Sequence, residues 1–298
     1  MEAPIPYLGE GLSLLSAVLW AVAVILFRKS GEKVHPLALN MFKNTLAFVL
    51  LLPTMWLFGE TLIRPVPSSA YILLLLSGVI GIGLGDTLFF TSLNLLGAGL
   101  TGIVICLYSP FIIMLSVLWL GESLALLQVI GAFLIISAVL IATIEKRDER
   151  ISNSRLLLGI LSGVFSSACM AVGIVMIKPL LERSPLLWLT EVRLVGGSVA
   201  LVLILLLHPR RRRIVNSLIS RQSWQYTISG SFFGAYVAMI VWLAGMKYTL
   251  ASIASALNQT STIFIFILAG IFLKEPFNVR RTIGIILAVM GVFLVFFG

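Results

Sequence analysis

Ten long apolar stretches constrain the fold of this chain more than any other feature of its sequence. They are separated by charged residues, Pro or Gly, and they lie at residues 8–27, 36–58, 70–94, 98–120, 125–144, 157–178, 185–208, 224–247, 250–273 and 281–297. A helix needs about 20 apolar residues to cross a ~30 Å hydrocarbon layer. None of the stretches shows the alternating pattern of barrel strands. The sequence therefore predicts an all-α membrane protein with ten transmembrane helices.

The composition leaves no room for a separate soluble domain. Of 298 residues, 59% are hydrophobic and 11% are charged, whereas an ordinary soluble domain has about a quarter charged residues. In a soluble protein the net charge of +9 would indicate a nucleic-acid partner. Here the cations lie between apolar stretches, as expected for loops facing anionic lipid. We expect the lipid bilayer as a partner, and no nucleic acid.

Residues for catalysis or metal binding do not form a pattern. Cys106 and Cys169 each lie inside an apolar stretch, and His35 and His208 lie beside Pro at the ends of stretches. No spacing typical of a metal site and no Ser/His/Asp or Cys/His grouping is present in the sequence. The sequence therefore favours a protein that is not an enzyme, with no cofactor and no metal.

Landmarks recur between the two halves of the chain. The motif LSVLWLGE ends at Glu122 and LAGIFLKE ends at Glu275, a shift of 153 residues, while Lys43 and Arg193 recur at a shift of 150. Such weak self-similarity is typical of an internal duplication.

The duplication predicts two five-helix repeats, at residues 1–145 and 156–298. Because five is odd, the second repeat is expected to be inverted relative to the first. Inverted repeats enclose a cavity near the bilayer midplane and open it to alternate sides by rocking. This architecture favours transport of a small molecule.

The loop charges predict an orientation. The odd-numbered loops hold 15 Lys and Arg and the even-numbered loops hold 4. Cationic loops stay on the cytoplasmic side. We therefore expect a multi-pass protein of the plasma (inner) membrane with both termini extracytoplasmic.

The pattern as a whole resembles the EamA family of the drug/metabolite transporter superfamily. The most specific pieces are Ser109-Pro110 in the fourth stretch, Gly121-Glu122 and Lys274-Glu275. The second copy has Ser261-Thr262 where the family often has Pro, so the sequence gives no reason to expect a matching kink there. The resemblance implies a membrane carrier of small metabolites, frequently an exporter of amino acids or related compounds, that works by alternating access.

Other functions remain open at this level. Lys43 and Arg193 would also suit a phosphate clamp, as in an organophosphate or nucleotide-sugar exchanger. An intramembrane enzyme would need a carboxylate or His pair converging at one interface, and a non-transporting scaffold would need no central polar cavity.

Lys43 and Asp86 are ionisable residues within predicted spans, where a charge costs on the order of 2.5–3.5 kcal/mol by insertion scales. Counted from the same side, both lie roughly 10–12 Å deep. We expect either an ion pair between them, or a Lys43 that extends to the headgroups while Asp86 faces a wet cavity alone.

Glu191 and Arg193 enter the seventh predicted span from the opposite side. Two residues apart on a helix, they point in different directions and need separate partners. Arg193 either joins Lys43 in a cradle for a carboxylate or phosphate, or binds groups at the membrane rim. Asp86 and Glu191 are the candidate proton carriers, because a partly buried carboxyl favours its protonated form.

Polar and aromatic residues within the spans are candidates for the lining of the cavity. Asn258 and Gln259 open a run of five polar residues, which either offer donors and acceptors to a substrate or hydrogen-bond to neighbouring helices. Substrate contact is favoured for Asn258 and Gln259, and the bonds to helices are favoured for Thr260, Ser261 and Thr262. Tyr108 lies just before Pro110, which removes a backbone hydrogen bond and bends the helix. Trp20 lies deep in the first stretch, where it either stacks on a substrate or packs in the core.

The remaining candidates concern packing and gating. Gly78, Gly81 and Gly85 form a small-residue face that allows close approach of a neighbouring helix. Glu122 and Glu275, at helix ends, are expected to cap or hold the turn to the next helix, with gating as the less favoured alternative.

Overall fold

The computed structural model describes residues 7–123, 125–143, 152–219, 223–275 and 279–297, and these residues form helices and no strands. Within these described residues, eight helical segments are long and apolar enough to cross a membrane. The other two predicted spans contain shorter apolar helices, Leu126–Ala138 and Thr282–Val295. The number of ten spans therefore stays a prediction. The predicted end of the first repeat at residue 145 lies outside the described residues.

The first half of the chain runs from α1 to α7. Its elements, in which η denotes a π-helical segment, are α1 (Leu8–Gly31), α2 (Pro36–Leu57), α3 (Ser68–Ser77), η1 (Gly78–Gly85), α4 (Asp86–Leu96), α5 (Ala98–Ile105), α6 (Tyr108–Leu115), η2 (Ser116–Leu120) and α7 (Leu126–Thr143). Pro36 starts α2 at a position where its missing N–H costs nothing. Gly97, with a φ of 84°, makes the tight turn from α4 to α5.

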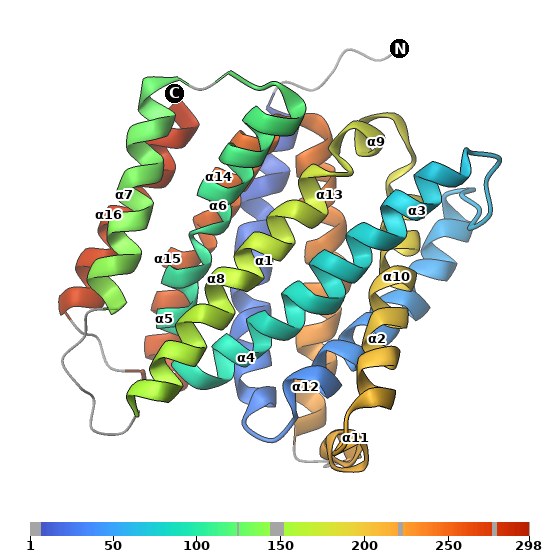
Figure 1. Cartoon of the computed structure of the whole chain (residues 1–298), viewed down its shortest axis with the longest axis horizontal. Coiled ribbons are helices and arrows are strands. Elements are labelled where there is room, and N and C mark those ends of the chain that lie inside the picture. Colours follow the sequence, from blue (N-terminus) through green and yellow to red (C-terminus); the bar gives the residue numbers. More distant parts are fainter. Residues whose placement is uncertain (1–6, 124, 144–151, 220–222, 276–278, 298) are drawn as a thin grey trace.

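The second half runs from α8 to α16. Its elements are α8 (Asn153–Val175), α9 (Lys178–Arg183), α10 (Leu186–Leu207), α11 (Arg211–Ile219), α12 (Trp224–Gly230), η4 (Ser231–Val237), α13 (Ala238–Tyr248), α14 (Ala251–Gln259), α15 (Ser261–Leu268), η5 (Ala269–Leu273) and α16 (Val279–Phe297). Short helices α9 and α11 lie at opposite ends of the bundle (Figure 1).

Corresponding helices of the two halves run in opposite directions. In Figure 1, α1 descends from the end of the bundle where both termini lie, whereas α8 ascends toward that end. Helices α7 and α16 pack side by side at one edge, where Gly131 and Gly291 approach each other's backbone.

The π-helical segments recur at the same shift as the sequence landmarks. Segments η1 and η4 begin at Gly78 and Ser231, and η2 and η5 begin at Ser116 and Ala269, each 153 residues apart. The duplication inferred from sequence is therefore visible in local backbone geometry.

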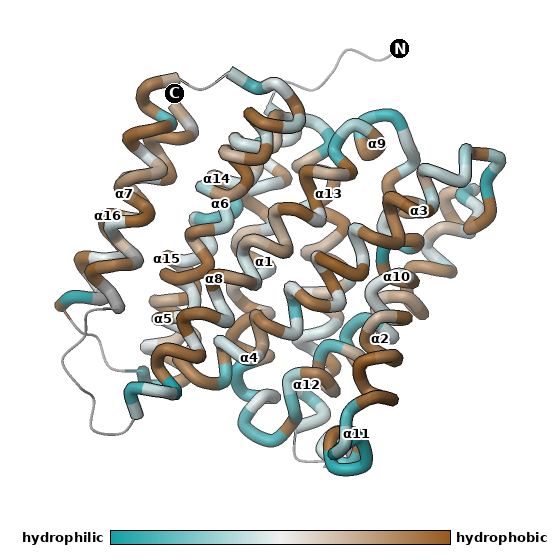
Figure 2. Tube along the Cα trace, viewed as in Figure 1, coloured by the Kyte–Doolittle hydropathy of each residue, from teal (hydrophilic) through white to brown (hydrophobic). Residues whose placement is uncertain are grey.

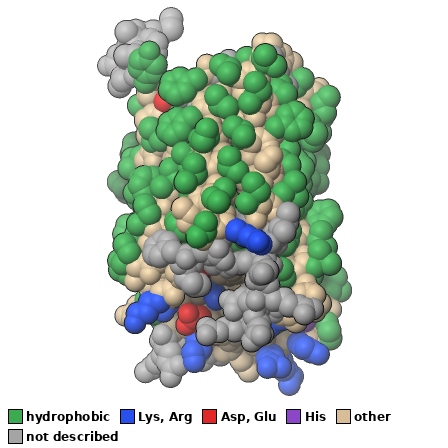
Figure 3. Space-filling view, turned by 90° about the vertical axis from the view of Figure 1, so that its left-hand side faces the viewer, with side chains coloured by type: hydrophobic (Ala, Val, Ile, Leu, Met, Phe, Trp, Pro, Cys, Tyr) green, Lys and Arg blue, Asp and Glu red, His purple; other side chains and the backbone are tan. Residues whose placement is uncertain are grey.

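The outer surface is apolar. In Figure 2 hydrophobic residues dominate the helices, and hydrophilic residues gather in the connections at the two ends. Outward-facing side chains include Phe165, 59% exposed, and Leu207, 85% exposed. The face in Figure 3 is covered by hydrophobic side chains, with Lys and Arg toward one end. A surface of this kind suits hydrocarbon rather than water.

Candidate functional site

A cavity of about 140 Å³ lies between the two halves, and we call it the central cavity. Both halves contribute to its wall. Its charged, polar and aromatic lining residues are Ser16, Trp20, Lys43, Asp86, Phe89, Thr101, Tyr108, Arg193, Trp242, Asn258, Gln259, Ser261 and Thr262. All six residues predicted to bind substrate are in this set.

Lys43 and Asp86 form an ion pair in the wall of this cavity. Helix α2 supplies Lys43 and the first residue of α4 is Asp86, and their Nζ and Oδ2 atoms lie 2.6 Å apart. Lys43 also donates to Asn44 Oδ1 at 3.0 Å. The structure thus contains the predicted ion pair, and the alternative in which Lys43 extends to the headgroups is wrong.

Arg193 lies in the cavity and does not reach an end of the bundle. Its residue is 4% exposed, and its Nε donates to Ser77 Oγ at 2.9 Å. Ser77 in turn donates to the carbonyl of Gly173 on α8. Among the described residues no carboxylate lies within 4.0 Å of the guanidinium, because the ion pairs found there involve other cations. The placement of Arg193 at the membrane rim is therefore wrong.

Two residues that line the same cavity carry a buried hydroxyl group without a partner among the described residues. Tyr108 and Thr101 are buried, and in the described part of the chain neither Tyr108 Oη nor Thr101 Oγ1 has a hydrogen-bond partner. Buried polar atoms normally find partners. The residues Tyr108 and Thr101 line the cavity, while these two oxygen atoms are themselves covered by protein.

Aromatic rings supply much of the apolar wall. Trp20 packs on Phe89 with ring centroids 5.5 Å apart, and Tyr108 packs on Trp242 at 6.5 Å. Trp20 thus packs on neighbouring rings and also lines the cavity, and its stacking on a substrate stays a prediction.

The two broken helices meet the cavity at their breaks. The fourth predicted span is interrupted at Cys106 and Leu107, before Pro110, and the ninth is interrupted at Thr260 without any proline. Thr260 Oγ1 donates to the carbonyl of Leu257 at 2.7 Å. A hydroxyl that bonds to the preceding turn of its own helix bends that helix. The break in the second half therefore lies at a threonine hydroxyl, whereas the break in the first half lies just before a proline. This kink was not expected from the sequence.

Asn258 and Gln259 lie just before that break. Asn258 Nδ2 donates to Ser16 Oγ at 2.6 Å, which ties α14 to α1. Gln259 is 4% exposed and lines the cavity. Ser261 and Thr262, which ranked behind them as predicted substrate contacts, line it as well.

Glu191 lies apart from the central cavity. Its residue is fully buried, and neither carboxyl oxygen has a hydrogen-bond partner among the described residues. The expected separate partner for Glu191 is thus missing in this part of the chain. An ionised carboxylate in such surroundings is energetically costly.

The predicted glycine face allows η1 to contact α8 and α10. A Cβ added to Gly78 would overlap the carbonyl oxygen of Arg193, and one added to Gly85 would lie 3.1 Å from Met170 Cγ. At Gly81, which lines the cavity, the added Cβ would lie 3.6 Å from the Arg193 guanidinium. Gly78 therefore sets how closely the helix bearing Arg193 packs.

Glu122 and Glu275 make reciprocal contacts between the halves. Glu275 Oε1 and Oε2 accept from the backbone N–H groups of Ala98 and Gly99, at 2.7 and 2.9 Å. Glu122 Oε2 accepts from Ser252 Oγ at 2.9 Å, where α14 begins. The capping role was predicted, but each carboxylate acts on a helix of the opposite half and not on its own turn.

Some lining residues were missed by the sequence analysis. Trp242 and Met239 lie 153 residues after Phe89 and Asp86, and all four line the cavity. The sequence landmarks recur at shifts of 153 and 150, whereas the π-helical segments fix the shift at 153. Applying that shift to Asp86 would have found Met239, whereas Phe89, the counterpart of Trp242, was not a candidate. Asp86 still has no acidic counterpart.

Metal ligands do not gather within the described ranges, where no group of three or more His, Cys, Asp or Glu is placed to hold an ion.

A family model and two named relatives indicate a transporter, and a solved structure shares the fold. A family model, the EamA-like transporter family, matches residues 7–144 and 157–297. An uncharacterized transporter of Archaeoglobus fulgidus is 25% identical over 283 residues, which is 95% of this chain and 96% of that protein. One of Methanothermobacter thermautotrophicus is 26% identical over 239 residues, 80% of this chain and 68% of its own length. A solved crystal structure has the same fold, with a TM-score of 0.73, 17% identity, and coverage of 96% of this chain and 95% of that one.

Proposed function

This chain belongs to the EamA-like transporter family, and from that premise we propose that it exports small polar metabolites, amino acids or related compounds, by alternating access. It is a multi-pass membrane transporter. The substrate, the direction and the coupling ion are the content of the proposal.

We choose the substrate class from the charge of the central cavity. Lys43 is paired with Asp86 at 2.6 Å, so Arg193 is a cation of the lining without a carboxylate partner. A substrate carboxylate would supply that partner through charge-assisted hydrogen bonds. Asp86 and Lys43 neutralise each other, so the lining presents the single positive charge of Arg193 to a substrate. An amino acid or related compound would bind there through its carboxylate.

Size and polarity agree with a small amino acid or a related compound. The cavity has a volume of about 140 Å³, aromatic walls from Trp20 and Trp242, and polar lining residues that include Asn258 and Gln259. An apolar wall with a few convergent polar groups is typical of small-molecule sites.

The transport step is proposed to be a rocking of two inverted five-helix repeats, residues 1–145 and 156–298, with ten membrane spans between them. Support comes from the opposite directions of α1 and α8 and from the breaks in the helix pairs α5–α6 and α14–α15 beside the cavity. Broken helices at a midplane site are a recurrent device of carriers with inverted repeats.

Proton coupling is proposed at Asp86 and Glu191. Asp86 is held by Lys43, so protonation of Asp86 would release the lysine. Glu191 is buried without a hydrogen-bond partner among the described residues, which favours its neutral form in this conformation. A change in the surroundings of either carboxyl during rocking would couple proton release to transport.

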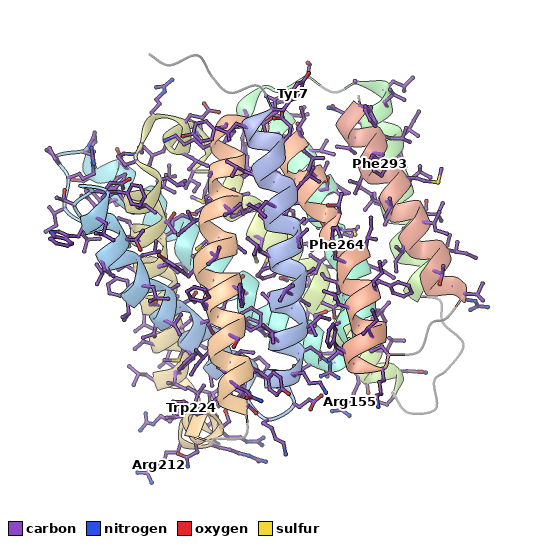
Figure 4. All side chains as sticks on the ribbon, turned by 180° about the vertical axis from the view of Figure 1, so that it is seen from behind. Tyr7, Arg155, Arg212, Trp224, Phe264 and Phe293 are labelled. Carbon is purple, nitrogen blue, oxygen red and sulfur yellow. The ribbon has the colours of Figure 1, made fainter. Side chains whose placement is uncertain are left out.

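The proposed location is the plasma (inner) membrane with both termini extracytoplasmic. Arg155 and Arg212 lie at the end of the bundle opposite to Tyr7 (Figure 4). Cationic ends are retained in the cytoplasm.

An organophosphate exchanger is the second candidate, since Lys43 and Arg193 both line the cavity. Neutralisation of Lys43 by Asp86 favours a singly charged carboxylate over a doubly charged phosphate.

Uptake into proteoliposomes tests the proposal. Amino acids, phosphosugars and hydrophobic cations are offered with and without a pH gradient to wild type, Asp86→Asn and Glu191→Gln. We expect amino-acid uptake that a gradient accelerates in wild type, and loss of the acceleration in at least one variant. Transport of phosphosugars alone would favour the second candidate. Unchanged gradient-driven flux in both variants would remove both carboxyls from the mechanism.

A further inference from the structure

A second cleft, separate from the central cavity, opens at the basic end of the bundle. Its volume is about 520 Å³. One wall is the α1–α2 connection, and the other runs from the end of α10 into α11. We call it the histidine cleft; its lining residues are Gly31, Glu32, Lys33, Val34, His35, Pro36, Asn94, His208, Arg210, Arg213, Ile214 and Ser217.

The hydrogen bonds of the two histidines fix which ring nitrogen donates. His35 Nδ1 accepts from the backbone N–H of Leu37 at 3.2 Å, and His208 Nδ1 accepts from that of Arg210 at 3.1 Å. A neutral imidazole whose Nδ1 accepts must carry its proton on Nε2. Both rings therefore keep an Nε2–H donor for another group, and their centroids are 6.4 Å apart.

The charges around the rings are mostly positive. Lys33, Arg210 and Arg213 line the cleft, while Glu32 is the single acidic residue among the described lining residues. Glu32 also forms an ion pair with Lys29, a residue outside the cleft lining, because its Oε1 lies 3.9 Å from Lys29 Nζ. The cleft thus offers an excess of positive charge together with two imidazole donors.

The two walls come from different halves of the chain and are already joined. The backbone N–H of His35 donates to Ser217 Oγ at 3.0 Å, which links the start of α2 to α11. Helix α11 is amphipathic, with Ile214 buried at 3% exposure and its arginines exposed. A ligand between these walls would bridge the two halves at this end of the bundle.

We propose that the histidine cleft binds a phosphate group, with His35 and His208 donating to it and Arg210 and Arg213 neutralising it. A phosphate has several acceptor oxygens in a tetrahedral arrangement, which suits separate donors and the planar fork of arginine better than a single carboxylate does. The group belongs either to an anionic phospholipid or to free phosphate. Basic pockets at this level of a membrane protein commonly hold lipid headgroups. Binding here is independent of the substrate proposed for the central cavity.

The test measures ligand binding and thermal unfolding of the full chain. One arm titrates inorganic phosphate into detergent-solubilised protein, with sodium chloride at equal ionic strength as the control. The other arm compares nanodiscs of phosphatidylcholine with and without phosphatidylglycerol. We expect saturable stabilisation in wild type, in the first arm if the source is free phosphate and in the second if it is lipid.

The variants distinguish binding at a specific site from general electrostatic attraction of anions to the basic end. Arg213→Gln removes a lining cation, while Arg212→Gln removes an adjacent exposed cation of α11 that does not line the cleft and is labelled in Figure 4. His35→Asn and His208→Asn retain a side-chain acceptor for the backbone N–H and remove the imidazole donor.

We expect affinity to fall by about tenfold or more in Arg213→Gln and in the double histidine variant, and to be unchanged in Arg212→Gln. The unliganded unfolding midpoint of Arg213→Gln, an exposed residue, verifies that the fold is intact. Two results overturn the proposal: stabilisation by neither ligand beyond the salt control, or equal losses in Arg212→Gln and Arg213→Gln.

Discussion

Lys43 Nζ lies 2.6 Å from Asp86 Oδ2 inside the bundle, with side chains only 3% and 13% exposed. Each charge would be costly alone at that depth, because an unpaired ion in a low-dielectric interior has lost its hydration without compensation. The pair therefore controls both the stability of the cavity wall and the charge that the cavity presents to a substrate.

The first prediction concerns this pair. Lys43→Met or Asp86→Asn leaves one buried charge unpaired and should lower the free energy of unfolding by about 3–5 kcal/mol. The double variant Lys43→Asp with Asp86→Lys should recover much of that loss. Thermal unfolding in detergent measures the coupling, and a double exchange as damaging as the single changes would show that the pairing contributes nothing.

The second prediction concerns the packing of α10 on η1. Gly78→Ala places a methyl group against the backbone of Arg193 and should destabilise the protein by about 1–3 kcal/mol. Gly81→Ala is the matched control, since its added Cβ meets its nearest neighbour at 3.6 Å. Equal unfolding midpoints for the two variants would contradict the close approach at Gly78.

Counting residues along the predicted helices placed Lys43 and Asp86 at nearly equal depth, which allowed the ion pair and left open a Lys43 that extends to the headgroups. A rise of ~1.5 Å per residue converts sequence position into depth, and both residues belong to one half of the chain. Arg193 was not placed this way. Its depth from the nearest end is small, so sequence allowed it to extend outward, and only the packing of η1 and α8 around Ser77 directs it inward.

The third prediction concerns the carboxylates that join the halves. Glu275→Gln removes one acceptor and the negative charge at the N-terminus of α5 and should cost about 1–2 kcal/mol of stability. Glu122→Gln should cost less, because its contact is one hydroxyl that an amide oxygen also accepts. Glu32→Gln, in a half-exposed pair, is the control. Chemical denaturation ranks the three, and a larger loss for Glu122→Gln would contradict the account.

The partners of Glu275 and the break at Thr260 show where sequence reasoning stops. Glu275 caps α5, which lies far away in sequence, and that contact depends on how the two halves dock. The break in the ninth span arises beside a threonine that donates to its own helix, and threonine is common in unbroken helices. The carboxylate contact and the helix break each recur in the other half at a shift of 153 residues. A comparison of the two halves therefore indicates features that local sequence patterns do not.

The fourth prediction concerns pH. Partial burial of the ring, and then the neighbouring His208, lower the pKa of His35 below its ordinary value of 6.5. The unfolded chain therefore binds this proton more readily than the folded chain. The contribution of neutral His35 to the stability of the folded chain is complete above pH 6.5. It is lost as the pH falls from 6.5 toward the lower pKa of His35 in the folded chain. In phosphate-free detergent, His35→Asn should show a weaker fall in unfolding midpoint over this window than wild type, and parallel profiles would contradict the prediction.

Uptake by the Arg193→Gln variant tests the central claim most directly, because the account assigns the substrate carboxylate to this guanidinium. Purified wild type, Arg193→Gln and Arg155→Gln, the last an exposed cation at the basic end, are reconstituted and offered amino acids and their decarboxylated amines. The account predicts that wild type prefers the amino acids, that Arg155→Gln behaves like wild type, and that the half-saturation concentration of Arg193→Gln rises about tenfold or more for amino acids alone. Equal transport of acids and amines by wild type, or an unchanged half-saturation concentration in folded Arg193→Gln, would contradict it.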